Sequence, residues 1–222
     1  MMTLPDIPRL YTALAEWLAC MVYVLALRPR FGRGATILIG AGWLLGMGVF
    51  LQLTGHVPIV WWIPCMAAAV AAMYLLLLLA CEIPALDAGY CCARAFILAE
   101  FAASLEWQIH CLLWPSRSGS HPAALLLMAV VYAAVYGFVF WFDIRRMGRG
   151  IGSIGASGRS LVSAVVMAIT AFAVSNLSFA QSGSNTMSVF YIRTLVDFAG
   201  VLILSIQQEQ LLLKCSNSLR KR

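Results

Sequence analysis

Seven apolar runs of about twenty residues constrain the fold of this sequence more than any other feature. A helix needs about 20 apolar residues to cross the hydrocarbon core of a bilayer. The runs are continuous, whereas strands of a membrane barrel alternate apolar and polar residues, so each run predicts a transmembrane helix. The predicted spans are 9–27, 35–54, 59–81, 91–114, 122–142, 160–180 and 188–210.

Composition leads to the same class of protein. Of the 222 residues, 62% are hydrophobic and 11% are charged, and the mean hydropathy is +0.88. A soluble domain of this composition would expose large apolar patches to water. We therefore predict an all-α integral membrane protein, a bundle of about seven transmembrane helices. The lipid bilayer is its predicted partner. We predict that it is a multi-pass protein of the cell membrane.

Basic residues gather in loops that an odd number of spans places on one side of the membrane. They follow the first span, flank the loop between the fifth and sixth, and follow the seventh: Arg28, Arg30, Arg33, Arg145, Arg146, Arg149, Arg159, Lys214, Arg220, Lys221 and Arg222. Cytoplasmic loops carry the excess of Lys and Arg. The N-terminus is therefore predicted outside and the C-terminus in the cytoplasm. The acidic loop "EIPALDAGY" after the third span is an exception among the cytoplasmic loops.

The net charge of +6 arises from these clusters and not from a basic helix face interleaved with aromatic residues. No nucleic-acid partner is therefore predicted. The seven cysteines lie in or beside apolar runs without a C-x-x-C pair, so they are expected to act as small apolar side chains. We predict no metal site and no cofactor.

Two glycine patterns have structural explanations. Gly150, Gly152 and Gly155 have the spacing of a dinucleotide-binding loop, but they follow a membrane span instead of a strand, so a flexible basic loop is predicted. Gly42 and Gly46 lie four residues apart within the second span. Small residues at that spacing allow helices to approach closely in lipid, so helix packing is predicted there.

Seven ionisable side chains fall inside the predicted spans. They are Glu16 in the first span, Arg94, Glu100, Glu106 and His110 in the fourth, and Arg193 and Asp197 in the seventh. Each would cost a few kcal/mol or more if it faced lipid, so each is expected to face the interior of the bundle. Glu106 and His110 lie four residues apart, as do Arg193 and Asp197, so each pair shares a helix face.

Three explanations of this intramembrane polar cluster remain open on the sequence alone. The groups could line an outward-facing pocket that senses a ligand, form structural pairs that fix helix register, or relay protons. The preferred pairings are Glu106 with Arg193, and Glu100 with the neighbourhood of Asp197. Four tryptophans are predicted to anchor span ends at the membrane interface: Trp61, Trp62, Trp107 and Trp114.

The last span continues into the polar segment "QQEQ", where a helix leaving the membrane is expected. We therefore divide the chain into a seven-helix transmembrane sensor domain, 1–210, and the start of a cytoplasmic linker or signalling helix, 211–222. Leu212 and Leu219 are seven residues apart, the spacing of one coiled-coil heptad.

"RAFILAEFAASLEWQIH" (94–110) and "YIRTLVDFAGVLILSIQQEQ" (191–210) resemble the membrane region of GHKL-type sensor histidine kinases of bacteria, relatives of the peptide-pheromone receptor kinases. The resemblance implies a homodimer in which the last helix transmits a signal to a cytoplasmic kinase domain, with a response regulator as partner of the full-length form. It implies a sensor core that contains Arg94, Glu100, Glu106, Arg193 and Asp197.

The predicted function is therefore a membrane-embedded sensor or receptor module of a two-component histidine kinase. It would sense an extracellular or membrane signal and pass it through the last helix. The 222 residues contain no phosphoacceptor or ATP-binding segment, so this chain is not expected to be an enzyme. The alternative is a small membrane transporter or the substrate-binding membrane subunit of an importer, which should have a polar outer pocket and no signalling helix.

Overall fold

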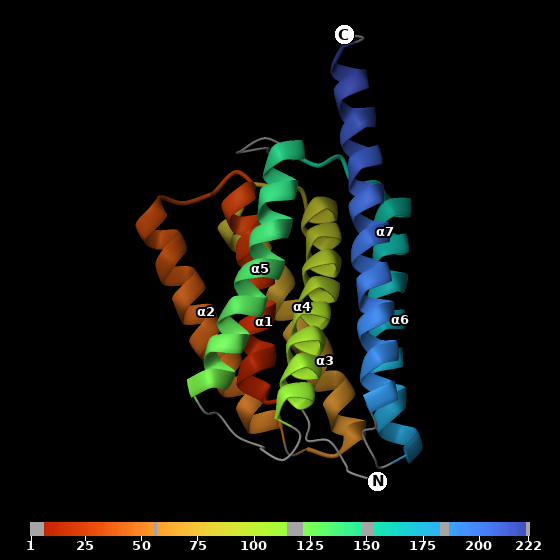
Figure 1. The fold of residues 1–222 in the computed structure, drawn as a ribbon. Helices are drawn as coiled ribbons and strands as arrows, with labels where there is room; N and C mark the ends of the chain where they lie inside the picture. Colours follow the sequence, from red (N-terminus) through yellow and green to blue (C-terminus); the bar gives the residue numbers. More distant parts are fainter. Residues whose placement is uncertain (1–6, 56, 115–121, 148–152, 183–186, 221–222) are drawn as a thin grey trace.

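Seven helices make up the computed structural model, which describes residues 7–55, 57–114, 122–147, 153–182 and 187–220 (Figure 1). For residues 59, 144–147, 176–182, 187–190 and 214–220 it describes the backbone alone. The helices are α1 Arg9–Ala26, α2 Arg33–Thr54, α3 Ile59–Ala80, α4 Ala85–Leu113, α5 Pro122–Met147, α6 Gly158–Ser182 and α7 Met187–Arg220. Each contains a stretch long and apolar enough to cross a membrane, which confirms the predicted all-α class and the seven spans.

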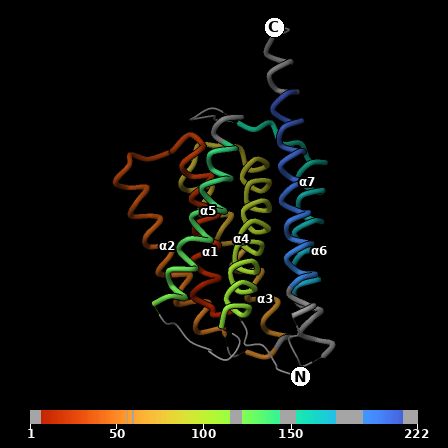
Figure 2. Tube along the Cα trace, viewed as in Figure 1, coloured from red at the N-terminus to blue at the C-terminus, as the bar shows by residue number. Residues whose placement is uncertain are grey.

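α4 is the central helix of the bundle. It packs against α1, α3, α5, α6 and α7, and 83% of the residues in its apolar stretch are buried, against 22% in α2 and α5. Figure 2 shows α6 and α7 together on one side of the molecule and α2 on the opposite side. The predicted span with the most ionisable residues thus belongs to the most buried helix of the bundle, as the cost of charge in a bilayer requires.

Consecutive helices alternate in direction, so the loops α1–α2, α3–α4 and α5–α6 share the end of the bundle from which α7 leaves (Figure 1). This is the arrangement that an odd number of spans predicts. Arg28, Arg33 and Arg159 all lie at this end, which we call the α7-exit end. Its assignment to the cytoplasm remains a prediction from the distribution of basic residues.

α7 is longer than its predicted span. Its 34 residues extend over about 51 Å, whereas the hydrocarbon core is about 30 Å thick. α7 continues unbroken across the predicted boundary between 210 and 211 to Arg220, as expected of a helix that leaves the membrane, and the division into two segments stays a prediction. The last two residues of the predicted linker lie outside the described part of the chain.

Two loops at the α7-exit end are joined by backbone pairing. The amide of Arg30 donates to the carbonyl of Ala80 and the amide of Glu82 donates to that of Arg28, both at 2.9 Å. The Arg28 guanidinium also lies 3.0 Å from the Glu82 carboxylate. The acidic loop that departs from the charge pattern is therefore placed directly beside an arginine cluster.

α4 begins at Ala85, six residues before the predicted start of the span at 91. Its first turn contains Asp87. The Asp87 carboxylate is buried and accepts hydrogen bonds from the α5–α6 loop. The donors are the Ser153 hydroxyl at 2.8 Å and the amides of Ile154 at 2.8 Å and Ala156 at 2.7 Å. The second acidic residue of "EIPALDAGY" is thus a structural anchor.

The glycine-rich loop is therefore not free over its described residues. Ile154 is fully buried, and Gly155 has a φ of 73°, a backbone angle that favours glycine. This corrects the expectation of a flexible loop for 153–156, where hydrogen bonds to Asp87 fix the backbone. Gly150 and Gly152 lie outside the described residues.

The glycines of α2 also differ from the prediction. A methyl group placed on Gly42 or Gly46 would meet nothing within 4 Å, so neither supports packing within the bundle. The contact with α1 is made by Gly40, whose carbonyl accepts a hydrogen bond of 2.9 Å from the Trp17 indole. Spacing alone identified a small-residue face, but the rotation of α2 about its axis decides which glycines meet a neighbour.

Candidate functional site

Six polar or charged side chains of α4 are buried, and they divide among different neighbouring helices. They are Asp87, Arg94, Glu100, Ser104, Glu106 and His110. Each residue adds about 100° of rotation around a helix, so these positions point in several directions. α4 is therefore a central element through which several helices exchange polar contacts.

The closest buried ion pair joins α4 to α7. The Arg193 guanidinium donates to Glu100 Oε2 at 2.6 Å, and the two side chains are 11% and 8% exposed. The same carboxylate oxygen accepts a hydrogen bond of 3.3 Å from the Ser175 hydroxyl of α6. Three helices, α4, α6 and α7, therefore meet at one carboxylate.

One helical turn further along α7, Asp197 makes a second contact with α4. The Ser104 hydroxyl donates to Asp197 Oδ2 at 3.4 Å, and Asp197 is fully buried. Arg193 and Asp197 thus face the same helix, as their spacing predicts. The predicted placement of Glu100 near Asp197 also agrees with the structure, because these two carboxylates are close enough to interact electrostatically.

The predicted pairing of Glu106 with Arg193 is wrong, because Arg193 pairs with Glu100. The six residues between Glu100 and Glu106 rotate the side chain by about 240° and move it by about 9 Å. Glu106 therefore points away from α7 and lies near two tyrosines of α1 and α5, Tyr11 and Tyr132.

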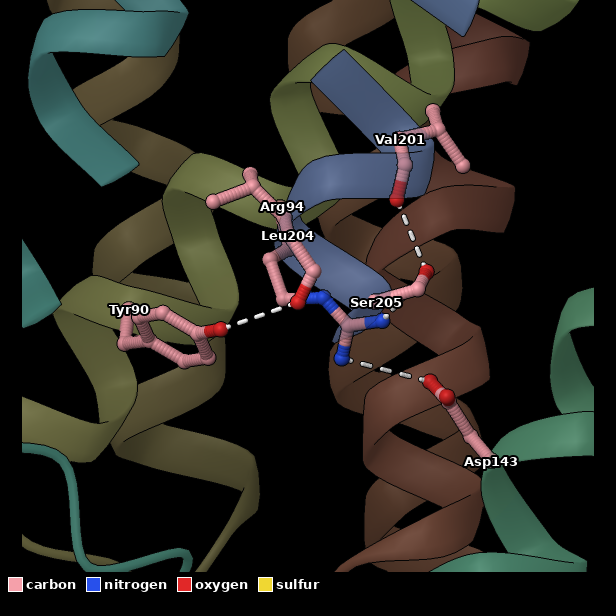
Figure 3. Close-up of polar contacts among 6 residues, drawn as sticks. All are labelled: Tyr90, Arg94, Asp143, Val201, Leu204 and Ser205. Carbon is pink, nitrogen blue, oxygen red and sulfur yellow. Dashed lines mark hydrogen bonds and ion pairs between the residues drawn. The ribbon is translucent and has the colours of Figure 1, made fainter. Parts of the chain in front are cut away.

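Arg94 forms a second connection between helices, nearer the α7-exit end (Figure 3). Its guanidinium is buried and donates to Asp143 Oδ2 of α5 and to the Ser205 hydroxyl of α7, each at 3.5 Å. One turn earlier on α4, the Tyr90 hydroxyl donates to the Leu204 carbonyl at 3.1 Å. α7 is thus held by polar contacts at two levels of α4.

Two further contacts define the surroundings of Arg94. The Ser205 hydroxyl donates to the Val201 carbonyl at 2.8 Å, within α7. The guanidinium lies 5.5 Å from the ring centroid of Tyr23 on α1, within the range of a cation–π contact. The Arg94 network therefore connects α1, α4, α5 and α7.

Sequence reasoning did not select Asp143 or Ser205 for this network. Asp143 follows the predicted fifth span directly, so it was assigned to a loop. A signal was present, because an acidic residue at a span end can pair with an unmatched arginine in another span. Ser104, Ser175 and Ser205 carry no such signal, since serine is common in membrane helices and often bonds to its own backbone.

Glu16 and Glu106 have no hydrogen-bond partner for either carboxylate oxygen among the described residues. Glu16 is 1% exposed and Glu106 is fully buried, so both face the interior as predicted. Neither is joined to Arg193. The seven ionisable residues thus form two salt-bridged networks and a separate buried region along α1, α4 and α5.

His110 lies in an aromatic stack at the end of α4. Its ring is parallel to that of Trp107, with centroids 4.7 Å apart, and Trp114 lies at 5.4 Å. Trp107 is 3% exposed, so it does not anchor the interface as predicted. Trp61 is exposed, and Trp62 lies beneath the Arg9 guanidinium at 4.0 Å.

Among the described residues, two large cavities lie between helices, in addition to a very small one beside Arg94. One, of about 480 Å³, is formed by α3, α4 and α6 and is lined by apolar side chains such as Met66, Phe96 and Phe172. The other, of about 400 Å³, lies between α1 and α2 and includes one polar side chain, Gln52. Within the described part of the chain, no three His, Cys, Asp or Glu side chains gather in a metal-binding arrangement.

Comparisons of the chain with protein-family models, with curated proteins and with solved structures gave no match. The resemblance of 94–110 and 191–210 to GHKL-type sensor kinases therefore remains a prediction from those residues. The geometry itself describes a multi-helix membrane bundle whose central helix is connected to the last helix by two buried polar networks.

Proposed function

We propose that this chain is a membrane sensor module that passes a signal arising at the bundle or its outer face through α7 to the cytoplasm. The observation that carries the proposal is the dual character of α7. Inside the bundle Arg193, Asp197 and Ser205 connect it to α4, and the same unbroken helix extends beyond the bundle to Arg220. A cytoplasmic kinase domain is the receiver that the resemblance suggests.

The contacts suit a switch because they are few, polar and buried. An ion pair or hydrogen bond has a discrete geometry, so α4 and α7 can adopt alternative pairings without unpacking the bundle. A signal that alters the pairing of Glu100 with Arg193 would change the position of α7 relative to α4. The receiver would respond to that displacement.

The transporter alternative receives less support from the site. It calls for a polar pocket that opens outward, whereas the two large cavities among the described residues, of about 480 and 400 Å³, are lined almost wholly by apolar side chains. Four charged side chains inside the bundle are instead engaged with one another, Arg193 with Glu100 and Arg94 with Asp143.

A chimeric kinase tests the proposal. Residues 1–220 are joined, in helical register, to the dimerisation and catalytic segments of a histidine kinase, and autophosphorylation is measured in membranes. Arg193→Gln is expected to change autophosphorylation several-fold, because it breaks the contact between α4 and α7. Leu195→Ala on the exposed face of the same helix is the matched control and should leave the rate unchanged.

Equal rates for the chimera, Arg193→Gln and Leu195→Ala, at equal amounts of folded protein, would contradict the sensor proposal. Energy-dependent accumulation of a solute by cells that express the unmodified chain would favour the transporter instead.

A further inference from the structure

Glu16 is a buried acid that belongs to neither of the salt-bridged networks described above. It lies in the middle of α1 and is 1% exposed, and both of its carboxylate oxygens lack a hydrogen-bond partner among the described residues. α1 packs against α2, α3, α4 and α5, so the side chain is enclosed by protein and does not reach toward lipid headgroups.

Among the residues whose side chains are described, the groups around Glu16 do not include a counter-charge. Titratable side chains close enough to interact with it come from α4, α5 and α1 itself, and they are Glu100, Cys92, Tyr136 and Cys20. The Tyr136 hydroxyl is already engaged, because it donates to the Ala15 carbonyl at 2.8 Å. α3 contains no acidic or basic residue, and the only one in α2 is Arg33 at its first position.

Buried arginines elsewhere in the bundle are committed to other acids. Arg193 holds Glu100 at 2.6 Å, and Arg94 holds Asp143 at 3.5 Å. Glu100 therefore adds negative charge to the surroundings of Glu16 without supplying it with a donor.

An ionised carboxylate in such a place would be stabilised neither by water nor by a cation. Groups in this position take up a proton instead, since a neutral carboxylic acid costs far less to bury than a charge. We propose that Glu16 is a proton-binding site, a carboxylic acid that holds its proton at neutral pH in the folded bundle. Ionisation breaks its O–H bond and transfers the proton to water, so it requires water to enter between α1 and α4.

Release of the proton from Glu16 would also affect the contact of α7 with α4. This part of the inference rests on the proposed sensor function. Glu100 interacts electrostatically with Glu16 and forms an ion pair with Arg193. A charge on Glu16 would compete with Glu100 for the attraction of Arg193. Protons are thus a candidate effector of the contact between α4 and α7.

The proposal is confined to Glu16. Glu106 also lacks hydrogen-bond partners among the described residues, but His110 lies one turn away on the same helix face. A histidine can supply positive charge near neutral pH, so the protonation of Glu106 does not follow from the same argument.

Infrared spectroscopy of the full chain in phospholipid vesicles at neutral pH tests the proposal. The spectrum of Glu16→Gln is subtracted from that of the unmodified protein. If the proposal is correct, the band that disappears is the carbonyl stretch of a protonated carboxylic acid, which shifts in D2O. Loss of the two carboxylate stretching bands instead would overturn it. Glu100→Gln is the matched control and should lose carboxylate bands, because Glu100 pairs with Arg193.

A second measurement needs no variant. Dicyclohexylcarbodiimide, an apolar reagent, reacts with protonated carboxyl groups, and mass spectrometry of the unmodified protein locates the product. Modification of Glu16 that decreases as pH rises supports the proposal, whereas modification of other buried carboxyl groups without Glu16 contradicts it. Neither measurement involves a kinase, so a chimera that fails to respond would count against the sensor function alone.

Discussion

Arg193 and Glu100 lie 2.6 Å apart, and their side chains are only 11% and 8% exposed. Removal of one member of a buried pair leaves an unpaired charge and costs about 3–5 kcal/mol. We expect Glu100→Gln and Arg193→Gln each to lower the free energy of unfolding by an amount of this order. The double variant should lose less than the sum, because neither member of this ion pair is then left without its partner.

The free energy of unfolding of all three variants is measured in mixed micelles with increasing amounts of SDS. Glu16→Gln is the control, since its carboxyl group has no partner to lose among the described residues. Strict additivity of the two single losses would show that Arg193 and Glu100 are not coupled.

Arg94 contacts two helices through one guanidinium, and lysine cannot reproduce this geometry. A single ammonium lacks the planar fork that reaches Asp143 and Ser205 together. Arg94→Lys should therefore lower the free energy of unfolding by about 1.5–3 kcal/mol, the value of a hydrogen bond to a charged group. Arg28→Lys is the matched control and should change it by less than about 0.5 kcal/mol, since its pair with Glu82 is exposed. Equal losses for the two variants would exclude a bridging role for Arg94.

At the level of elements, Asp87 connects α4 to the α5–α6 loop through three hydrogen bonds. Asp87→Ala removes the two carboxylate oxygens that accept these three hydrogen bonds and leaves the amides of Ile154 and Ala156 without these partners. We expect hydrogen exchange of the peptide that covers 153–157 to become at least tenfold faster, with little change in α6 itself. Unchanged exchange would show that other contacts hold the loop, and Glu82→Ala at the exposed neighbouring pair is the control.

α4 and α7 approach closely at Gly200. A methyl group there would come within 3.0 Å of the Ile97 side chain, so a larger residue must displace α7 or distort Ile97. Gly200→Val should lower the free energy of unfolding by about 1–3 kcal/mol through overpacking. The control is Gly137→Val in α5, where no atom lies within 4 Å and no loss is expected. A loss of equal size in both variants would point to helix propensity as the cause.

Elements of this fold were predictable because each span is a local property of the chain. Seven continuous apolar runs gave seven helices, and the interior positions of Glu16, Glu100 and Asp197 followed from the cost of charge in lipid. Pairings were not predictable, because they depend on the rotation of each helix and on which helices are neighbours. The pairing of Glu106 with Arg193 is therefore predicted wrongly. The partner of Arg193 is Glu100, and Glu106 lies about 240° further around α4 than Glu100. Asp143 was overlooked because a span end looks the same in sequence whether it is buried or solvated.

For the whole molecule, the distribution of basic residues predicts the orientation in the membrane. Loops with Arg28, Arg33 and Arg159 share the end from which α7 leaves, so one reporter tests the side to which all of them belong. Alkaline phosphatase fused after Arg222 should be inactive and a fluorescent protein at the same position should be bright, as for a cytoplasmic C-terminus. High phosphatase activity there would reverse the predicted orientation.

The length of α7 makes it a lever. From Arg193 to Arg220 the helix spans 27 residues, or about 40 Å, and its described polar contacts with α4 lie within the first half of that distance. A tilt of about 5° at Arg193 would displace the far end by about 3.5 Å, given the helical rise per residue. Rearrangement of a single ion pair in the bundle would therefore arrive at Arg220 as a movement large enough to shift the register of two packed helices.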